Sequence, residues 1–133
     1  MTYLIDTHWI ASFLNGREEA RQLFQALTFQ ESAMSLVTYG EIYEGIYYGR
    51  NPLQSERSFQ QFLRALAVLP LNRAILRQFG RIRGDLRRRG EIIGDPDILI
   101  AATALHHNLT LVTQNRQHFE RIPELQLYRS DAP

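Results

Sequence analysis

Three carboxylates stand where the chain changes from one expected element to the next. Asp6 ends the short apolar segment TYLID, Glu41 follows the apolar segment SAMSLV within TYGEIYEGI, and Asp97 begins the apolar run DILIAATAL. In an open parallel sheet, the carboxyl ends of strands and the amino ends of the following helices lie along one edge, where ligands bind. We therefore expect these acids to gather in one cleft.

Helix capping is the alternative role for each acid, and taken singly it is the preferred one. Asp6 could cap the helix that follows it. Thr38-x-x-Glu41 matches a capping box, in which the glutamate reaches back to the backbone at the threonine. In the DPD segment at 95–97, the first aspartate is a good N-cap and the second favours the helix dipole.

Electrostatics favours the shared cleft over three separate caps. One cap contributes about 1 kcal/mol, whereas two carboxylates about 4 Å apart repel by roughly 4 kcal/mol at an effective dielectric constant near 20. A bound divalent cation would offset this repulsion. Oxygen ligands in a chain without cysteine suit Mg²⁺ or Mn²⁺. Such ions activate water for attack on phosphodiesters.

The elements that must position these acids alternate along the chain. Expected strands are 2–6, 32–37, 67–71, 109–113 and 125–128; expected helices are 8–15, 17–28, 38–49, 53–66, 72–90, 95–108 and 114–119. Strands that alternate with helices imply parallel strands and crossover helices. We expect one domain, residues 1–133, of the α/β class: a three-layer α/β/α sandwich with a mainly parallel central sheet.

Composition narrows the class of protein. The chain has 133 residues, of which 44% are hydrophobic and 22% charged, as in a globular domain. It has no cysteine, which excludes disulfides and thiolate metal sites and fits a reducing compartment. No segment has the features of a signal peptide, and no apolar stretch reaches the roughly 18–20 residues that span a membrane. We expect a cytoplasmic protein with no membrane association.

Four segments, LIDT, TYGEIYEGI, DILIAATAL and LVTQNRQHF, resemble in this order the PIN-domain ribonucleases, and more narrowly the VapC toxins of type II toxin–antitoxin pairs. The resemblance covers nearly the whole chain. It implies an endoribonuclease that depends on Mg²⁺ or Mn²⁺ and cuts RNA, with transfer RNA among the candidate substrates. It also implies inhibition by a small cognate antitoxin and a homodimer.

The resemblance assigns the site residue by residue. It implies that Asp6, Glu41 and Asp97 hold the metal and that Asn115 is the fourth catalytic position. The family's third acid directly precedes an x-Leu-Ile-Ala-Ala segment, which selects Asp97 rather than Asp95. Many PIN domains carry aspartate at the fourth position, whereas VapC-like members often carry asparagine, so the number of ions stays open.

Two threonines and four arginines complete the candidate site. Thr7 and Thr113 could hydrogen-bond the carboxylates or the phosphate. On a helix, four arginines fall within about 80° of one another and could neutralise RNA phosphates; they are Arg73, Arg77, Arg81 and Arg88. A solvated helix face explains this arginine stripe equally well.

Aromatic and histidine side chains have structural explanations that we prefer. Tyr39, Tyr43 and Tyr47 follow helical spacing and are expected in the core, with a dimer or antitoxin interface as the alternative. The four histidines show no metal-ligand spacing and are expected at the surface or in packing. Glu44 is the nearest rival to Glu41 and is expected to face solvent.

Two other functions compete with the ribonuclease. A catalytically weak PIN domain could bind RNA or protein as a scaffold, and Asn115 keeps that reading open. A phosphatase of the haloacid dehalogenase type needs a second aspartate two residues after the first, and position 8 is histidine. The sequence therefore disfavours the phosphatase.

Overall fold

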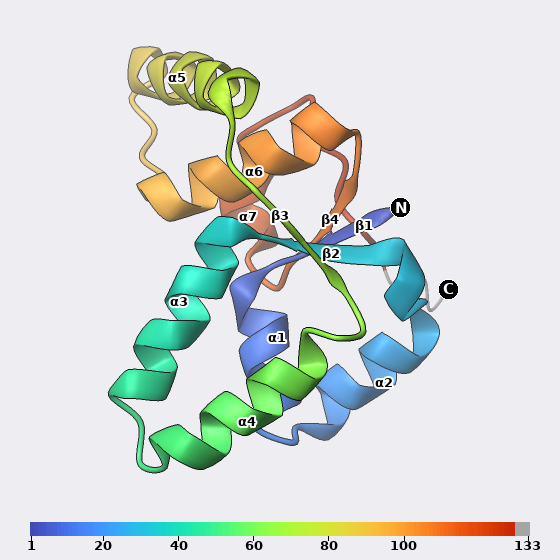
Figure 1. The fold of residues 1–133 in the computed structure, drawn as a ribbon. Coiled ribbons are helices and arrows are strands. Elements are labelled where there is room, and N and C mark those ends of the chain that lie inside the picture. Colours follow the sequence, from blue (N-terminus) through green and yellow to red (C-terminus); the bar gives the residue numbers. More distant parts are fainter. Residues whose placement is uncertain (130–133) are drawn as a thin grey trace.

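A computed structural model describes residues 1–129 and shows a four-stranded parallel sheet between layers of helices (Figure 1). The strands are β1 (Tyr3–Ile5), β2 (Ser32–Ser35), β3 (Ala67–Leu69) and β4 (Thr110–Val112), in the order β3-β2-β1-β4. All three strand pairs are parallel. The expected α/β/α architecture is confirmed.

Seven α-helices and one short 3-10 helix surround the sheet within the described residues. They are α1 (Thr7–Leu14), α2 (Glu18–Ala26), α3 (Leu36–Tyr47), α4 (Pro52–Phe62), α5 (Arg73–Arg88), α6 (Asp95–His107), α7 (Arg116–Phe119) and the 3-10 helix Phe29–Glu31. In this part of the chain, no helix has the length and apolar character needed to cross a membrane.

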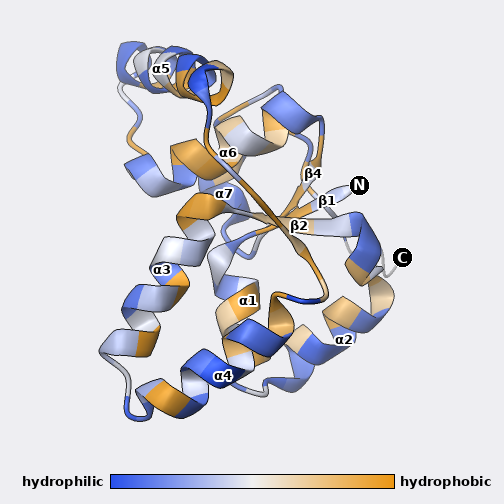
Figure 2. Cartoon of the chain, in the orientation of Figure 1, coloured by the Kyte–Doolittle hydropathy of each residue, from blue (hydrophilic) through white to orange (hydrophobic). Residues whose placement is uncertain are grey.

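Alternation along the strands creates one hydrophobic core on each face of the sheet. In β1, Leu4 packs with α5 and α6 on one face, while Ile5 packs with α1, α3 and α4 on the other. Successive strand residues point to opposite faces, so this division follows from the two-residue period. Figure 2 shows apolar strands at the centre and polar outer faces on α2, α4 and α5.

Helix α6 is apolar on nearly every side because it lies between α5 and the sheet. Its buried residues include Ile98, Ile100 and Ala101, and it contacts both α5 and β4. A helix covered on two sides has no wide solvent face, so it lacks the usual polar stripe. This burial fixes the N-terminal end of α6, and with it Asp97, at the edge of the sheet.

The boundary between β2 and α3 differs from the expectation, and the predicted capping box is wrong. The strand ends at Ser35, whose Oγ accepts a hydrogen bond from the backbone N–H of Val37 at 3.1 Å, and α3 begins at Leu36. Ser35 is therefore the N-cap. Thr38 lies buried inside the helix, and Glu41 lies beyond the first turn.

Two further expectations about local structure need correction. The segment 125–128 is not a strand: it makes one isolated parallel bridge, between Leu127 and Leu111 of β4. Asp95 is not the N-cap of α6, because that position belongs to Gly94. Asp95 is instead the first helical residue, and its Oδ1 lies 2.8 Å from Nε of Arg83.

Candidate active site

Asp6 lies at the point where the strand order reverses. The chain runs from β1 to β2 and β3 on one side, whereas β4 pairs with the other side of β1. Asp6 follows β1 and caps α1, and Thr113 follows β4. In open α/β sheets, ligands bind in the crevice at such a reversal, beyond the carboxyl ends of the strands.

Both carboxylate oxygens of Asp6 are held by hydrogen bonds. The Thr7 backbone N–H donates to Oδ1 at 2.7 Å, and the Thr113 hydroxyl donates to Oδ2 at 2.6 Å. The side chain is only 6% exposed, so these bonds offset the cost of burying a charge. The bond from Thr113 crosses the strand reversal and joins the ends of β1 and β4.

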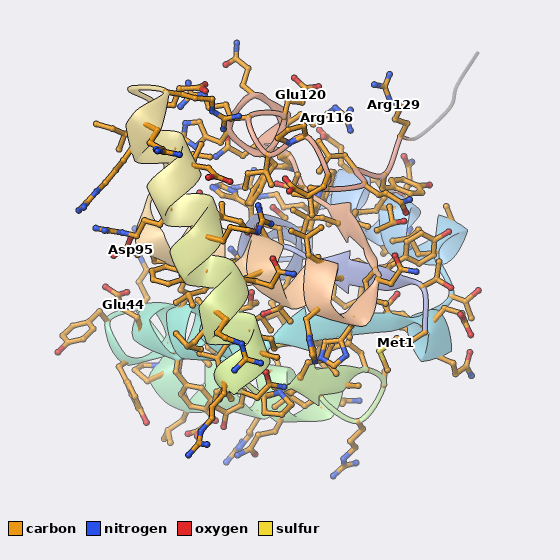
Figure 3. The ribbon with its side chains drawn as sticks, turned by 90° about the horizontal axis from the view of Figure 1, so that it is seen from above. Met1, Glu44, Asp95, Arg116, Glu120 and Arg129 are labelled. Carbon is orange, nitrogen blue, oxygen red and sulfur yellow. The ribbon has the colours of Figure 1, made fainter. Side chains whose placement is uncertain are left out.

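Glu41 is held from the same helix end. The Thr7 hydroxyl donates to Oε1 of Glu41 at 2.6 Å and lies 3.0 Å from the hydroxyl of Thr38. Since a hydroxyl has one proton, Thr7 accepts from Thr38 while it donates to Glu41. Thr38 therefore orients Thr7, a role that differs from the cap expected from the sequence. Glu44 is exposed at the outer edge of the molecule (Figure 3), as expected.

Asp97 lies half-buried in the first turn of α6, where the negative charges of Asp6 and Glu41 repel its own. Burial raises the pKa of Asp97 above its ordinary value, and the negative charges of Asp6 and Glu41 raise it further, while His118 acts in the opposite direction. Three elements of the fold thus bring the acids within electrostatic range of one another. That the three acids share one cleft stays a prediction.

Asn115 is connected to the acids through two neighbours, Thr113 and His118. Its backbone N–H donates to the Thr113 hydroxyl at 3.0 Å, and its side-chain Nδ2 lies 2.8 Å from Nδ1 of His118. The same Nδ1 lies 3.9 Å from Oδ2 of Asp97, which is too long for a hydrogen bond but close enough for an ion pair when the imidazole is protonated.

His118 is the site residue that the sequence reasoning missed. Surface or packing was the expectation for all four histidines, and no metal-ligand spacing singles this one out. The available signal was its position three residues after Asn115, which places both side chains on one side of a helical turn.

Comparison with known proteins agrees with this geometry. Residues 3–125 match the PIN domain. The chain is 33% identical over 128 residues to Ribonuclease VapC1 of Haemophilus influenzae, covering 95% of this chain and 96% of that protein. The chain belongs to the PIN-domain family, and within it to the VapC ribonucleases.

Two other VapC relatives extend the comparison. The tRNA(fMet)-specific endonuclease VapC of Salmonella typhimurium is 30% identical over 131 residues, covering 96% of each chain. The crystal structure of VapBC2 from Rickettsia felis, bound to a DNA fragment from its promoter, matches with a TM-score of 0.89 and 28% identity. That match covers 98% of this chain and 100% of the other.

The acids of this VapC chain fit a divalent cation by their chemistry. They offer hard oxygen ligands. The pKa of Asp97 is raised first by burial and then by the charges of Asp6 and Glu41, and a cation would offset that repulsion. Among residues 1–129, however, no group of three or more histidine, aspartate or glutamate side chains is arranged to hold one ion. Mg²⁺ usually keeps several waters and binds through one or two carboxylates, so it does not need three side chains on one ion.

The arginine stripe lies on α5, the outermost helix on its side of the sheet (Figure 3). All four arginines are exposed, and Arg81 forms ion pairs with Asp85 at 3.2 Å and with Glu124 at 3.0 Å. Arg73, Arg77 and Arg88 form no ion pair within residues 1–129. Their binding of RNA stays a prediction.

Proposed function

We propose that this chain is the toxin of a type II toxin–antitoxin pair and cuts RNA as an endonuclease that depends on Mg²⁺ or Mn²⁺. The observation that carries the site assignment is the convergence of Asp6, Glu41 and Asp97 at the strand reversal. Membership of the VapC ribonucleases supports the reaction.

Asp6, Asp97 and Glu41 are the residues that would hold the cation. When bound, the cation supplies a water of lowered pKa and stabilises charge that develops on the phosphate. Thr7 donates to the carboxylate of Glu41 and Thr113 to that of Asp6, and these bonds fix both side chains. Asn115 donates from Nδ2 to Nδ1 of His118 and so holds this imidazole beside Asp97. The expected products carry a 5′-phosphate and a 3′-hydroxyl.

The names of the relatives suggest the class of RNA substrate and the protein partner. Transfer RNA is a candidate substrate because the Salmonella relative is named as a tRNA(fMet)-specific endonuclease. An antitoxin is a candidate partner because the matched Rickettsia structure is a VapBC complex. A homodimer has a candidate surface at the turn between α3 and α4, where Tyr47, Tyr48 and Leu53 are exposed by 64%, 90% and 73%. We also propose a single domain over residues 1–133 and a cytoplasmic location.

The test compares two neighbouring aspartates of α6. Asp97→Asn is expected to reduce RNA cleavage at least about 100-fold while the protein stays folded. Asp95→Asn is the matched control, because Asp95 makes only an exposed ion pair with Arg83 and should keep most of the activity. The measurement is cleavage of transfer and messenger RNAs with Mg²⁺ or Mn²⁺.

The outcomes separate the ribonuclease from the scaffold. Equal cleavage by wild type and Asp97→Asn would remove Asp97 from the site. Binding of RNA without cleavage by the wild type would favour the catalytically weak PIN domain.

A further inference from the structure

A groove beside Glu41 runs between α1, α3 and α4. It has a volume of about 390 Å³, within the range of small-ligand pockets, and both Glu41 and Thr7 line it. Because these two residues also belong to the acid site, any group in the groove lies next to the bond that the acids would cut.

The deeper part of the groove is apolar. Ala11 and Leu14 contribute from α1, and Ile42 and Ile46 contribute from α3. The two isoleucines are also part of the core on this face of the sheet. Such a surface favours a flat, weakly hydrated group over a charged one.

The exposed part of the groove is polar but neutral. Asn15, Gln54, Ser55 and Ser58 present amide and hydroxyl groups, and none of these side chains makes a hydrogen bond within residues 1–129. They are therefore free to pair with a bound group. Glu41 is the one charged residue in the lining, and its negative charge would repel a phosphate.

We propose that this groove holds an unpaired base of the RNA, adjacent to the phosphodiester that is cut, and that Gln54 and its polar neighbours select the base. The inference rests on the proposed ribonuclease function. Proteins recognise single-stranded RNA by placing splayed bases against apolar surfaces and pairing with their edges. The groove has an apolar floor and a neutral polar rim, and it lies next to the proposed catalytic acids. These features suit the binding of a base.

Gly45 leaves the space that a base needs. It lines the groove from α3, and a Cβ built there would meet no atom within 4 Å. The Cβ of a larger side chain at position 45 would therefore clash with no neighbouring atom. Leucine also favours the helix more than glycine does, so Gly45→Leu should fill the groove and leave α3 intact.

The experiment measures cleavage preference rather than total activity. Short single-stranded RNAs with randomised sequence are cut in Mg²⁺ or Mn²⁺, and the products are sequenced. The wild type should show a base preference at one position next to the cut. Gln54→Ala should weaken that preference about 2- to 10-fold, the effect of one lost hydrogen bond. Gly45→Leu should remove most of it.

A matched glutamine serves as the control. Gln60 lies on α4, is exposed, and does not line the groove, so Gln60→Ala should leave the preference unchanged. Thermal unfolding establishes that each variant is folded; if Gly45→Leu does not fold, Gln54→Ala carries the test alone.

Three results would overturn the proposal in distinguishable ways. An unchanged base preference in folded Gln54→Ala and Gly45→Leu rejects the base pocket but leaves the ribonuclease standing. Variants that change only the affinity of a protein inhibitor would assign the groove to a protein segment. Absence of any cleavage by the wild type rejects the proposed function itself, and this inference with it.

Discussion

The carboxylate of Asp6 depends on the hydroxyl of Thr113, the residue that follows β4. Thr113→Val removes the donor to Oδ2, and the acceptor of the Asn115 backbone N–H, while it keeps the shape of the side chain. A buried carboxylate oxygen without its partner costs about 1–3 kcal/mol, so we expect a loss of stability of that size. Cleavage should fall as well, since Asp6 would no longer be fixed at the strand reversal.

Urea unfolding and a cleavage assay measure the two effects of Thr113→Val. Thr110→Val in β4 is the control, because the Thr110 hydroxyl makes no hydrogen bond within residues 1–129 and its loss should cost little stability. Equal destabilisation by the two variants would mean that the bond to Asp6 contributes nothing measurable.

Asp97 makes the folded protein less stable when it is ionised. Its pKa in the folded state is raised by burial, Asp6 and Glu41, so stability present below the ordinary pKa of 3.8 is lost as the pH rises through the raised value. Asp97→Asn cannot ionise. Without a divalent ion, we expect it to unfold a few degrees above wild type at pH 7 and by a smaller margin near the ordinary pKa.

Calorimetry from acid to neutral pH checks this sign, and a constant difference between the two proteins would contradict it. Addition of Mg²⁺ at pH 7 should stabilise wild type more than Asp97→Asn, because a ligand of the folded state raises its stability. EDTA should reverse that gain.

At this scale, topology alone let us expect Asp6, Glu41 and Asp97 at one edge of the sheet. The sequence also named Thr7 and Thr113 as donors to the carboxylates or the phosphate, and both hydroxyls donate to carboxylates in the structure. Which threonine holds which acid depends on side-chain geometry, which spacing does not specify. His118 had one local signal, its position three residues after Asn115, whereas its pairing with Asp97 could not be predicted because Asp97 is distant in the chain.

Among the elements, the junction of β2 and α3 shows why boundaries are harder to predict than element types. Leu36 and Val37 suit a strand as well as a helix, and both Ser35 and Thr38 are acceptable caps. The choice is tertiary: β2 pairs with β3 as far as Ser35, opposite Leu69, and the helix then begins. Segment 125–128 alternates like a strand, yet only Leu127 forms a bridge.

The packing of α3 on α4 provides a prediction about pH. Tyr39 and Tyr43 pack against Phe59, as expected for core residues, whereas the same expectation is wrong for Tyr47, which is 64% exposed. The Tyr43 hydroxyl donates to Oε2 of Glu56 at 2.9 Å. Burial, followed by the bond to Glu56, raises the pKa of Tyr43 to about 12. The stability that neutral Tyr43 provides is complete below the ordinary pKa of 10.0 and is lost as the pH rises toward 12.

Tyr43→Phe should therefore be less stable than wild type at pH 8, by about 1 kcal/mol, and the difference should shrink above pH 10. Ultraviolet titration of the tyrosines should lose its component near 12 in this variant. Tyr48→Phe is the control, because Tyr48 is 90% exposed and should change neither measurement. A Tyr43 that titrates with the exposed tyrosines would contradict the packing.

For the whole molecule, strand order decides where the acids meet. The sequence predicted parallel strands but not their order, because order depends on which strands pair across the chain. With β1 between β2 and β4, the ends of the first and last strands become neighbours, and residues 107 positions apart share a hydrogen bond. The same order places α5 and its arginines in the layer opposite α4 and the groove.

The distribution of charge over the molecule allows a test of the arginine stripe. The net charge is only +1, so attraction of RNA must come from local clusters. Arg77 is exposed and forms no ion pair within residues 1–129. If Arg77 contacts a phosphate, Arg77→Gln should lower the slope of log affinity against log salt by about 0.7, the value for single-stranded nucleic acid.

Arg17→Gln is the control, because it removes an equal charge from the start of α2 and should leave the slope unchanged. Fluorescence anisotropy with labelled RNA in EDTA measures both slopes without cleavage, and equal slopes for the two variants would leave α5 as a solvated helix face.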